Sequence, residues 1–161
     1  MLEIAGLPTH ILLLHAVVVL SPLAALGGIL YAVVPRWRRA TEITVAVLGI
    51  VSAGFAVLTA SAGERLEEAL PAEQLIREHA EHGDLLKAVA LVFAGLLVLL
   101  VLVTGPWTEG RLPQLDRFRG LPWLRLLLQV LTVLAGVFLI YQTVVTGHSG
   151  AVATWSEWRQ G

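Results

Sequence analysis

The chain has no cysteine among its 161 residues, and only 14% of its residues are charged. The absence of cysteine excludes disulfides, thiolate metal sites, iron–sulfur clusters and covalent haem attachment through a Cys-x-x-Cys-His motif. Soluble domains are about a quarter charged, whereas 57% of this chain is hydrophobic. The composition therefore predicts a protein whose solvent is a lipid bilayer.

Several functional motifs are also missing. The sequence has no Ser-His-Asp or metalloprotease pattern, no phosphate-binding glycine loop and no basic aromatic patch for nucleic acid. No acidic residue occurs in the middle of an apolar run, which argues against an ion-coupled carrier. The first ten residues contain no basic residue and no small-residue cleavage site, so the first apolar run is predicted to be a retained span. A binding protein or electron carrier is favoured over an enzyme.

Four apolar stretches each have about the 20 residues needed to cross roughly 30 Å of hydrocarbon. They predict membrane spans at about 11–34, 43–62, 85–104 and 124–146. The remaining chain is too short for a separate soluble domain, so residues 1–161 are predicted to form one domain. An outer helix over about 71–84, starting near Pro71, is expected to continue unbroken into the third span. The predicted fold class is all-α, an integral membrane four-helix bundle.

Arginine residues predict the orientation of this bundle. Pro35 ends the first span, and Arg36, Arg38 and Arg39 are expected to leave the membrane there. The loop before the fourth span is also rich in arginine, whereas the loop between the second and third spans is mainly acidic. Loops rich in Lys and Arg face the cytoplasm. The acidic loop and both termini are therefore predicted to lie outside, an N-out/C-out topology.

The histidines are the main candidates for chemistry. With this topology all five fall at the outer face: His10, His15, His79, His82 and His148. Leu75, His79, His82 and Leu86 follow the spacing of one helix face.

The two histidines of the first span are expected to point in different directions. His10 and His15 are about 7.5 Å apart along a helix axis and roughly 140° apart in rotation. At most one of them is therefore expected to face the same centre as the histidines of the third span. His15 lies deepest of the five, and an ionisable side chain inside a span indicates a functional site.

Imidazole is a common ligand of haem iron, copper and zinc, and facing helices of a four-helix bundle can hold a cofactor between them. The first hypothesis is a membrane cytochrome that holds haem b near the outer face, for electron transfer or haem handling. His15 and His82 would be the axial ligands, with His79 or His148 as substitutes. Small residues on the second span could make room for the haem: Gly49, Ala53, Gly54 and Ala56.

Two alternatives stay open. The second hypothesis is a copper, zinc or iron ion held by His79, His82, His148 and either His10 or His15. Nearby carboxylates would then orient the rings: Glu78, Glu81 or Asp84. The third is a structural or accessory subunit of a larger membrane complex, whose histidines bind nothing. A redox partner at the outer face and a homodimer are further partners that the sequence leaves open.

The opening segment GLPTHILLLHAVVVLSPLAAL resembles a bacterial membrane family catalogued as domain of unknown function 2231. That family typically begins with Leu-Pro-x-His-x-x-x-x-His and an apolar run containing Pro, and His10, His15 and Pro22 occupy those positions here. The segments SAGERL, HAEHGD and TGHSGA are also similar to it. The resemblance implies a four-span bundle of undetermined activity in a bacterial cytoplasmic membrane. A looser similarity to bis-histidine b-type cytochromes implies one haem, since all candidate ligands lie at one face.

Overall fold

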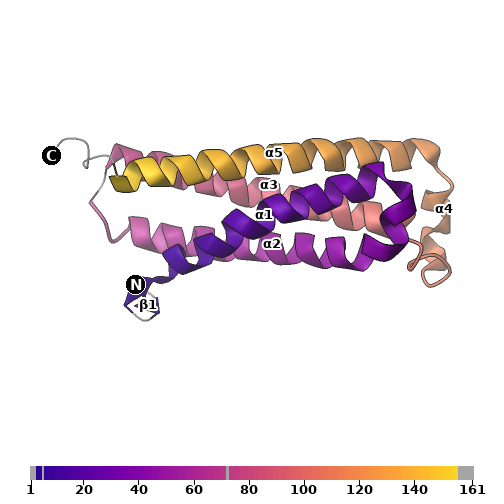
Figure 1. The fold of residues 1–161 in the computed structure, drawn as a ribbon, viewed down its shortest axis with the longest axis horizontal. Coiled ribbons are helices and arrows are strands. Elements are labelled where there is room, and N and C mark those ends of the chain that lie inside the picture. The colour runs from indigo at the N-terminus through magenta and orange to yellow at the C-terminus, as the bar shows by residue number, and fades with distance from the viewer. Residues whose placement is uncertain (1–2, 5, 72, 156–161) are drawn as a thin grey trace.

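Four long helices pack side by side as a bundle. The computed structural model describes residues 3–4, 6–71 and 73–155. The helices alternate in direction (Figure 1) and are α1 (Thr9–Val33), α2 (Arg38–Glu67), α3 (Gln74–Thr104) and α5 (Pro122–Trp155). The predicted all-α four-helix bundle is thereby confirmed. Within the predicted domain 1–161, residues 1–2, 5, 72 and 156–161 lie outside the described part of the chain.

Short elements lie at the two ends of the bundle. Before α1, the two-residue strands β1 (Glu3–Ile4) and β2 (Leu7–Pro8) pair in antiparallel orientation, and Gly6 between them has a φ of 78°. The sequence did not predict this small hairpin. The connections at the opposite end contain the 3-10 helices η1 (Pro35–Trp37) and η2 (Pro113–Leu115) and the short helix α4 (Asp116–Arg119).

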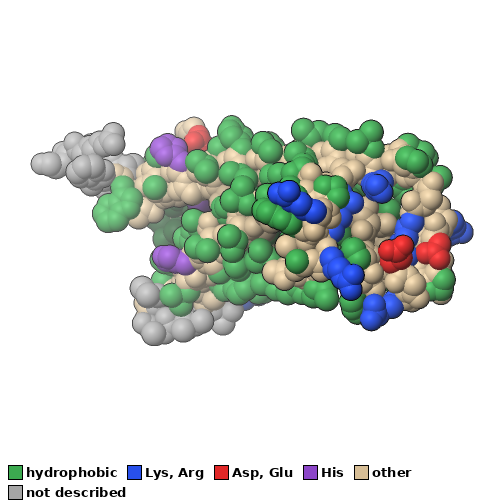
Figure 2. Space-filling view, turned by 45° about the vertical axis from the view of Figure 1, so that its right-hand side comes forward, with side chains coloured by type: hydrophobic (Ala, Val, Ile, Leu, Met, Phe, Trp, Pro, Cys, Tyr) green, Lys and Arg blue, Asp and Glu red, His purple; other side chains and the backbone are tan. Residues whose placement is uncertain are grey.

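The four helices form a closed ring in the order α1, α2, α3 and α5, with α1 and α3 diagonally opposite. Helices α1 and α3 begin at one end of the ring, and α2 and α5 finish there (Figure 1). All five histidines belong to these terminal segments, so this is called the histidine end. The opposite end, with η1, η2 and α4, is called the arginine end. On the face shown in Figure 2, basic side chains gather toward the arginine end and His lies at the other.

Small residues let the helices approach closely in the core. Gly28 of α1 and Gly136 of α5 both face the ring of Phe93 on α3, and a Cβ at Gly28 would lie 2.7 Å from Phe93 Cζ. A Cβ at Gly49 of α2 would lie 3.1 Å from Leu97 Cδ2 of α3. Close packing of small residues stabilises helix contacts where lipid removes the hydrophobic drive for association. These glycines therefore let α1, α2 and α5 pack tightly against Phe93 and Leu97 of α3.

The outer surface of the helices is apolar. Val19, Leu134 and Val144 are 63%, 60% and 65% exposed, and many other Leu, Val and Ile side chains also face outward. A soluble monomer rarely exposes so continuous an apolar surface. All four long helices have the length and hydropathy needed to cross a membrane. The chain thus has the features of a multi-pass membrane protein.

The helices extend beyond the predicted spans at the histidine end. Helix α2 ends at Glu67 rather than near residue 62, and α5 runs to Trp155 rather than near residue 146. Gly147 and Gly150, which follow the predicted end of the fourth span, lie inside α5. Helix α3 begins at Gln74 and passes without a break into its apolar part. Hydropathy detects only the apolar part of a helix, whereas backbone hydrogen bonding continues into amphipathic turns.

Among the three arginines expected to leave the membrane after the first span, Arg38 is the one that is buried within the protein. Arg38 is only 5% exposed, and its guanidinium donates from Nε to Tyr31 O at 3.2 Å and from Nη2 to Ala32 O at 3.1 Å. The last carbonyls of a helix have no partner within that helix. Arg38 supplies that partner for the end of α1, while Arg36 and Arg39 are exposed as expected.

Candidate functional site

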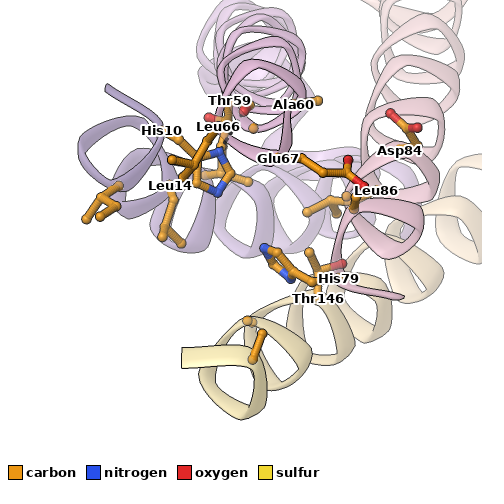
Figure 3. A pocket seen from close by; sticks show the side chains of 18 of the residues that line it. His10, Leu14, Thr59, Ala60, Leu66, Glu67, His79, Asp84, Leu86 and Thr146 are labelled. Carbon is orange, nitrogen blue, oxygen red and sulfur yellow. Dashed lines mark hydrogen bonds between the residues drawn. The ribbon is translucent and has the colours of Figure 1, made fainter. Parts of the chain in front are cut away.

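A cavity of about 520 Å³ lies between the four long helices at the histidine end. Its walls are mainly apolar, with side chains such as Leu14, Val17, Ala56 and Leu86 (Figure 3). Pockets of this volume hold organic ligands of cofactor size. His10 and His79 are the two histidines that line it.

His10 stands in the first turn of α1 and is held by α2. Its Nδ1 lies 2.8 Å from the carbonyl oxygen of Thr59. A carbonyl can only accept, so Nδ1 carries the proton and the neutral ring keeps its lone pair on Nε2. The ring rests against Gly63, where a Cβ would lie 3.0 Å from Nδ1. A larger residue at position 63 would push the ring out of place.

His79 stands near the start of α3 and is held by α5. Its Nδ1 lies 3.0 Å from the hydroxyl of Ser149, and that hydroxyl donates to Thr146 O at 2.9 Å. Since the hydroxyl has only one proton, it must accept from Nδ1, which leaves the lone pair of the neutral ring on Nε2. A Cβ at Gly150 would lie 2.8 Å from Cε1 of this ring. Both imidazoles are thus fixed in the same tautomer by neighbouring helices.

The two rings face each other across the cavity (Figure 3). Their centroids are 6.2 Å apart and their planes differ by 81°. Two imidazoles on opposite sides of one metal ion, each bound at about 2 Å, have centroids roughly 6 Å apart, since a ring centre lies about 1 Å beyond its nitrogen. The centroid distance between His10 and His79 is therefore compatible with two imidazoles on one metal ion, and the two rings meet edge to face.

The other three histidines do not line the cavity. His15 is exposed, and its Nδ1 donates to Ile11 O at 2.7 Å. His82 is half-buried, and its backbone carbonyl accepts from Gln142 and Thr146 of α5. His148 is exposed.

The expected axial pair of His15 and His82 is consequently not assembled at the cavity. The inward face of α1 carries His10, Leu14 and Val17 at helical spacing, and His15 is turned away from that stripe. His82 follows His79 by three residues, which places it about 60° further around α3. As the spacing of His10 and His15 predicted, only one histidine of the first span faces the centre.

The small residues of α2 contribute less to the cavity than expected. Ala56 lines it, but Gly49 packs against Leu97 and Gly54 faces outward with no atom near its Cβ position. Ala53 belongs to the packed core. The cavity therefore lies nearer the end of α2 than the sequence indicated.

The acidic residues do not orient the rings. Glu78 accepts from Gln74 at 2.8 Å, Asp84 pairs with Lys87 at 2.7 Å, and Glu81 is exposed. The rings are oriented instead by Thr59 O and the Ser149 hydroxyl. Metal-bound histidines typically donate their second nitrogen to such oxygens.

Sequence reasoning missed Thr59 and Ser149 because a main-chain acceptor and a single serine have no spacing signature. Gly63 and Ser149 do lie in the segments SAGERL and TGHSGA, which carried the resemblance. No group of three or more His, Cys, Asp or Glu side chains suited to a metal ion occurs among residues 3–4, 6–71 and 73–155. The four-histidine ion site is not assembled there.

Comparisons with protein-family models, with curated proteins and with solved structures gave no match to this chain.

Proposed function

We propose that this protein is a small membrane cytochrome, in which His10 and His79 bind one haem b as axial ligands. The observation that carries the proposal is the pair of facing imidazoles, 6.2 Å apart, inside a mainly apolar cavity of about 520 Å³. When bound, the haem would supply reversible one-electron chemistry. Each histidine would offer Nε2 to the iron, while Thr59 O or the Ser149 hydroxyl holds its Nδ1 proton.

The size of the cavity favours a haem over a bare ion. An ion bound by proteins takes three or four ligands as a rule. This cavity is lined by two imidazoles and by the carboxylates Glu64, Glu67 and Asp84, but no three such side chains are grouped closely enough for an ion in the described part of the chain. A haem macrocycle provides its own four nitrogen ligands and needs only axial ones from the protein. Apolar walls also suit the large hydrophobic face of the porphyrin.

The proposed cytochrome has a defined orientation in the membrane. The arginine end would face the cytoplasm and the histidine end the outside of a bacterial cytoplasmic membrane. Both termini would lie outside, and a haem near that surface could exchange electrons with a partner there. Because the natural chain has no cysteine, a single cysteine at Gln114 or at Glu68 can be tested for labelling in intact cells. Labelling at position 68 but not at position 114 is expected, and the reverse pattern would contradict the orientation.

The test of haem binding is the oxidised and dithionite-reduced absorption spectrum of protein purified in detergent from haem-supplied cells. A Soret band with sharp reduced α and β bands is expected. His10→Ala and His79→Ala should abolish the six-coordinate spectrum, whereas the matched control His15→Ala should retain it. A protein that stays colourless after haem titration would rule out the cytochrome. Elemental analysis would then distinguish a copper, zinc or iron site from an accessory subunit without cofactor.

A further inference from the structure

We infer that the arginine end binds the phosphate headgroups of anionic phospholipid through five exposed arginines. These form the arginine patch, defined as Arg36, Arg39, Arg111, Arg117 and Arg125. The inference is independent of haem binding at the opposite end. It is drawn from the charge balance, the side-chain contacts and the aromatic residues of the arginine end.

The arginine patch has an excess of positive charge without protein counter-ions. None of its five members forms an ion pair with any residue in the described part of the chain. Of the acidic residues at this end, Asp116 pairs with Arg119 at 2.8 Å and Glu42 is buried. Glu109 is the exposed carboxylate left near this face within the described residues.

Arg125 is exposed in the first turn of α5, whereas Arg38 is buried and held by the carbonyls of α1. Neither guanidinium has a carboxylate partner among the described residues. The exposed charge of Arg125 is therefore available to an anion from the membrane. Phosphate suits the site because a guanidinium can bind two of its oxygens at once.

Several guanidiniums of the patch lie over aromatic rings. Arg111 is 4.9 Å from the ring of Trp107, and Arg36 is 5.6 Å from the ring of Trp37. Trp37, Trp107 and Trp123 are all at least 43% exposed. Exposed tryptophans mark the headgroup level of a membrane. The arginine patch is therefore at the depth of lipid phosphates, which favours a lipid over free phosphate.

The experiment measures binding of phosphatidylglycerol, phosphatidylcholine and inorganic phosphate to the purified full chain in neutral detergent, by native mass spectrometry and thermal shift. Phosphatidylglycerol is expected to bind and to raise the Tm, and the other two probes to have little effect. Near a membrane surface each basic residue contributes about fivefold in affinity. Arg39→Gln with Arg125→Gln should therefore weaken phosphatidylglycerol binding roughly 25-fold.

The matched control is Arg65→Gln with Arg77→Gln, which removes two exposed arginines from the histidine end. It should change phosphatidylglycerol binding less than twofold. Equal losses in both double variants would overturn the inference, because attraction would then follow net charge alone. Binding of phosphatidylcholine as tight as that of phosphatidylglycerol would also overturn it. Inorganic phosphate that matches the lipid would show a free-anion site instead.

Discussion

The two ends of the bundle use buried polar groups in opposite ways. At the arginine end, Arg38 and Gln129 donate hydrogen bonds to the last carbonyls of α1, and Gln129 Nε2 lies 2.7 Å from Ala32 O. At the histidine end, His10 and His79 each form a hydrogen bond to the protein through Nδ1, which leaves Nε2 for a ligand in the cavity. Polar groups whose hydrogen bonds are all internal close and stabilise a structure. Polar groups that keep one hydrogen-bonding or metal-binding atom without a protein partner indicate a site for a ligand.

The largest expected effect is on the stability of the arginine end. Arg38→Met should lower the free energy of unfolding by about 3 kcal/mol, since it removes two hydrogen bonds from a charged donor and leaves Tyr31 O without its side-chain partner. Ala32 O keeps its hydrogen bond from Gln129. Unfolding by SDS titration in mixed micelles measures this change. Arg39→Met, at the exposed neighbouring position, should cost less than about 0.5 kcal/mol. Equal losses would show that the buried contacts of Arg38 do not stabilise the end of α1.

A single methyl group added at Gly150 should disrupt the cavity at the histidine end. In Gly150→Ala the new Cβ would overlap Cε1 of His79, so the ring must turn away from the facing imidazole. Haem affinity should fall on the order of a hundredfold, measured by spectral titration, because axial ligation needs placement within about half an ångström.

The control for this change is Gly54→Ala on α2, at an exposed position that does not line the cavity. No atom lies within 4 Å of a Cβ at Gly54, so its haem affinity should stay within twofold of the unsubstituted chain. Both variants gain the same helix propensity. If they bind haem equally well, His79 is not a ligand.

Removing the support of His79 should have a smaller effect. Ser149→Ala deletes the hydroxyl that fixes the Nδ1 proton, and loss of such a partner typically lowers metal affinity about 10-fold or more. Ser149→Thr keeps the hydroxyl and should restore most of the affinity. The measurement is again the spectral titration, together with the reduced α band. Unchanged affinity in the alanine variant would show that Ser149 does not orient the ring.

The smallest expected effect concerns Glu42, the buried carboxylate at the arginine end. Glu42 Oε1 accepts from the backbone N–H of Trp107 at 2.8 Å. Glu42→Gln keeps an acceptor of similar shape and should cost about 1 kcal/mol in unfolding free energy. Glu109→Gln, on the exposed surface, is the control and should have almost no effect. A larger loss in the control would contradict this role of Glu42.

The fold was predictable because apolar length alone specifies four crossing helices. The gathering of the histidines at one end also followed from the sequence, since alternating helices bring the start of α1 and α3 beside the ends of α2 and α5. The choice of ligands did not follow. Residues around His10 and His15 are apolar on every side of α1, so no amphipathic pattern marked the inward face. The burial of Arg38 also did not follow, because the carbonyls that it binds become its neighbours only in three dimensions.

The supports of the two imidazoles come from different helix pairs, and this has a consequence for biogenesis. Helices enter the membrane in the order of synthesis, so His10 meets its acceptor at Thr59 when only α1 and α2 are in place. The hydrogen bond between His79 and Ser149 can form only after α5 has been inserted. A ribosome-bound intermediate lacking α5 would therefore present one fixed ring and one unfixed ring. If the proposed haem is bound, pigmentation of the protein would thus report that α5 has joined the bundle.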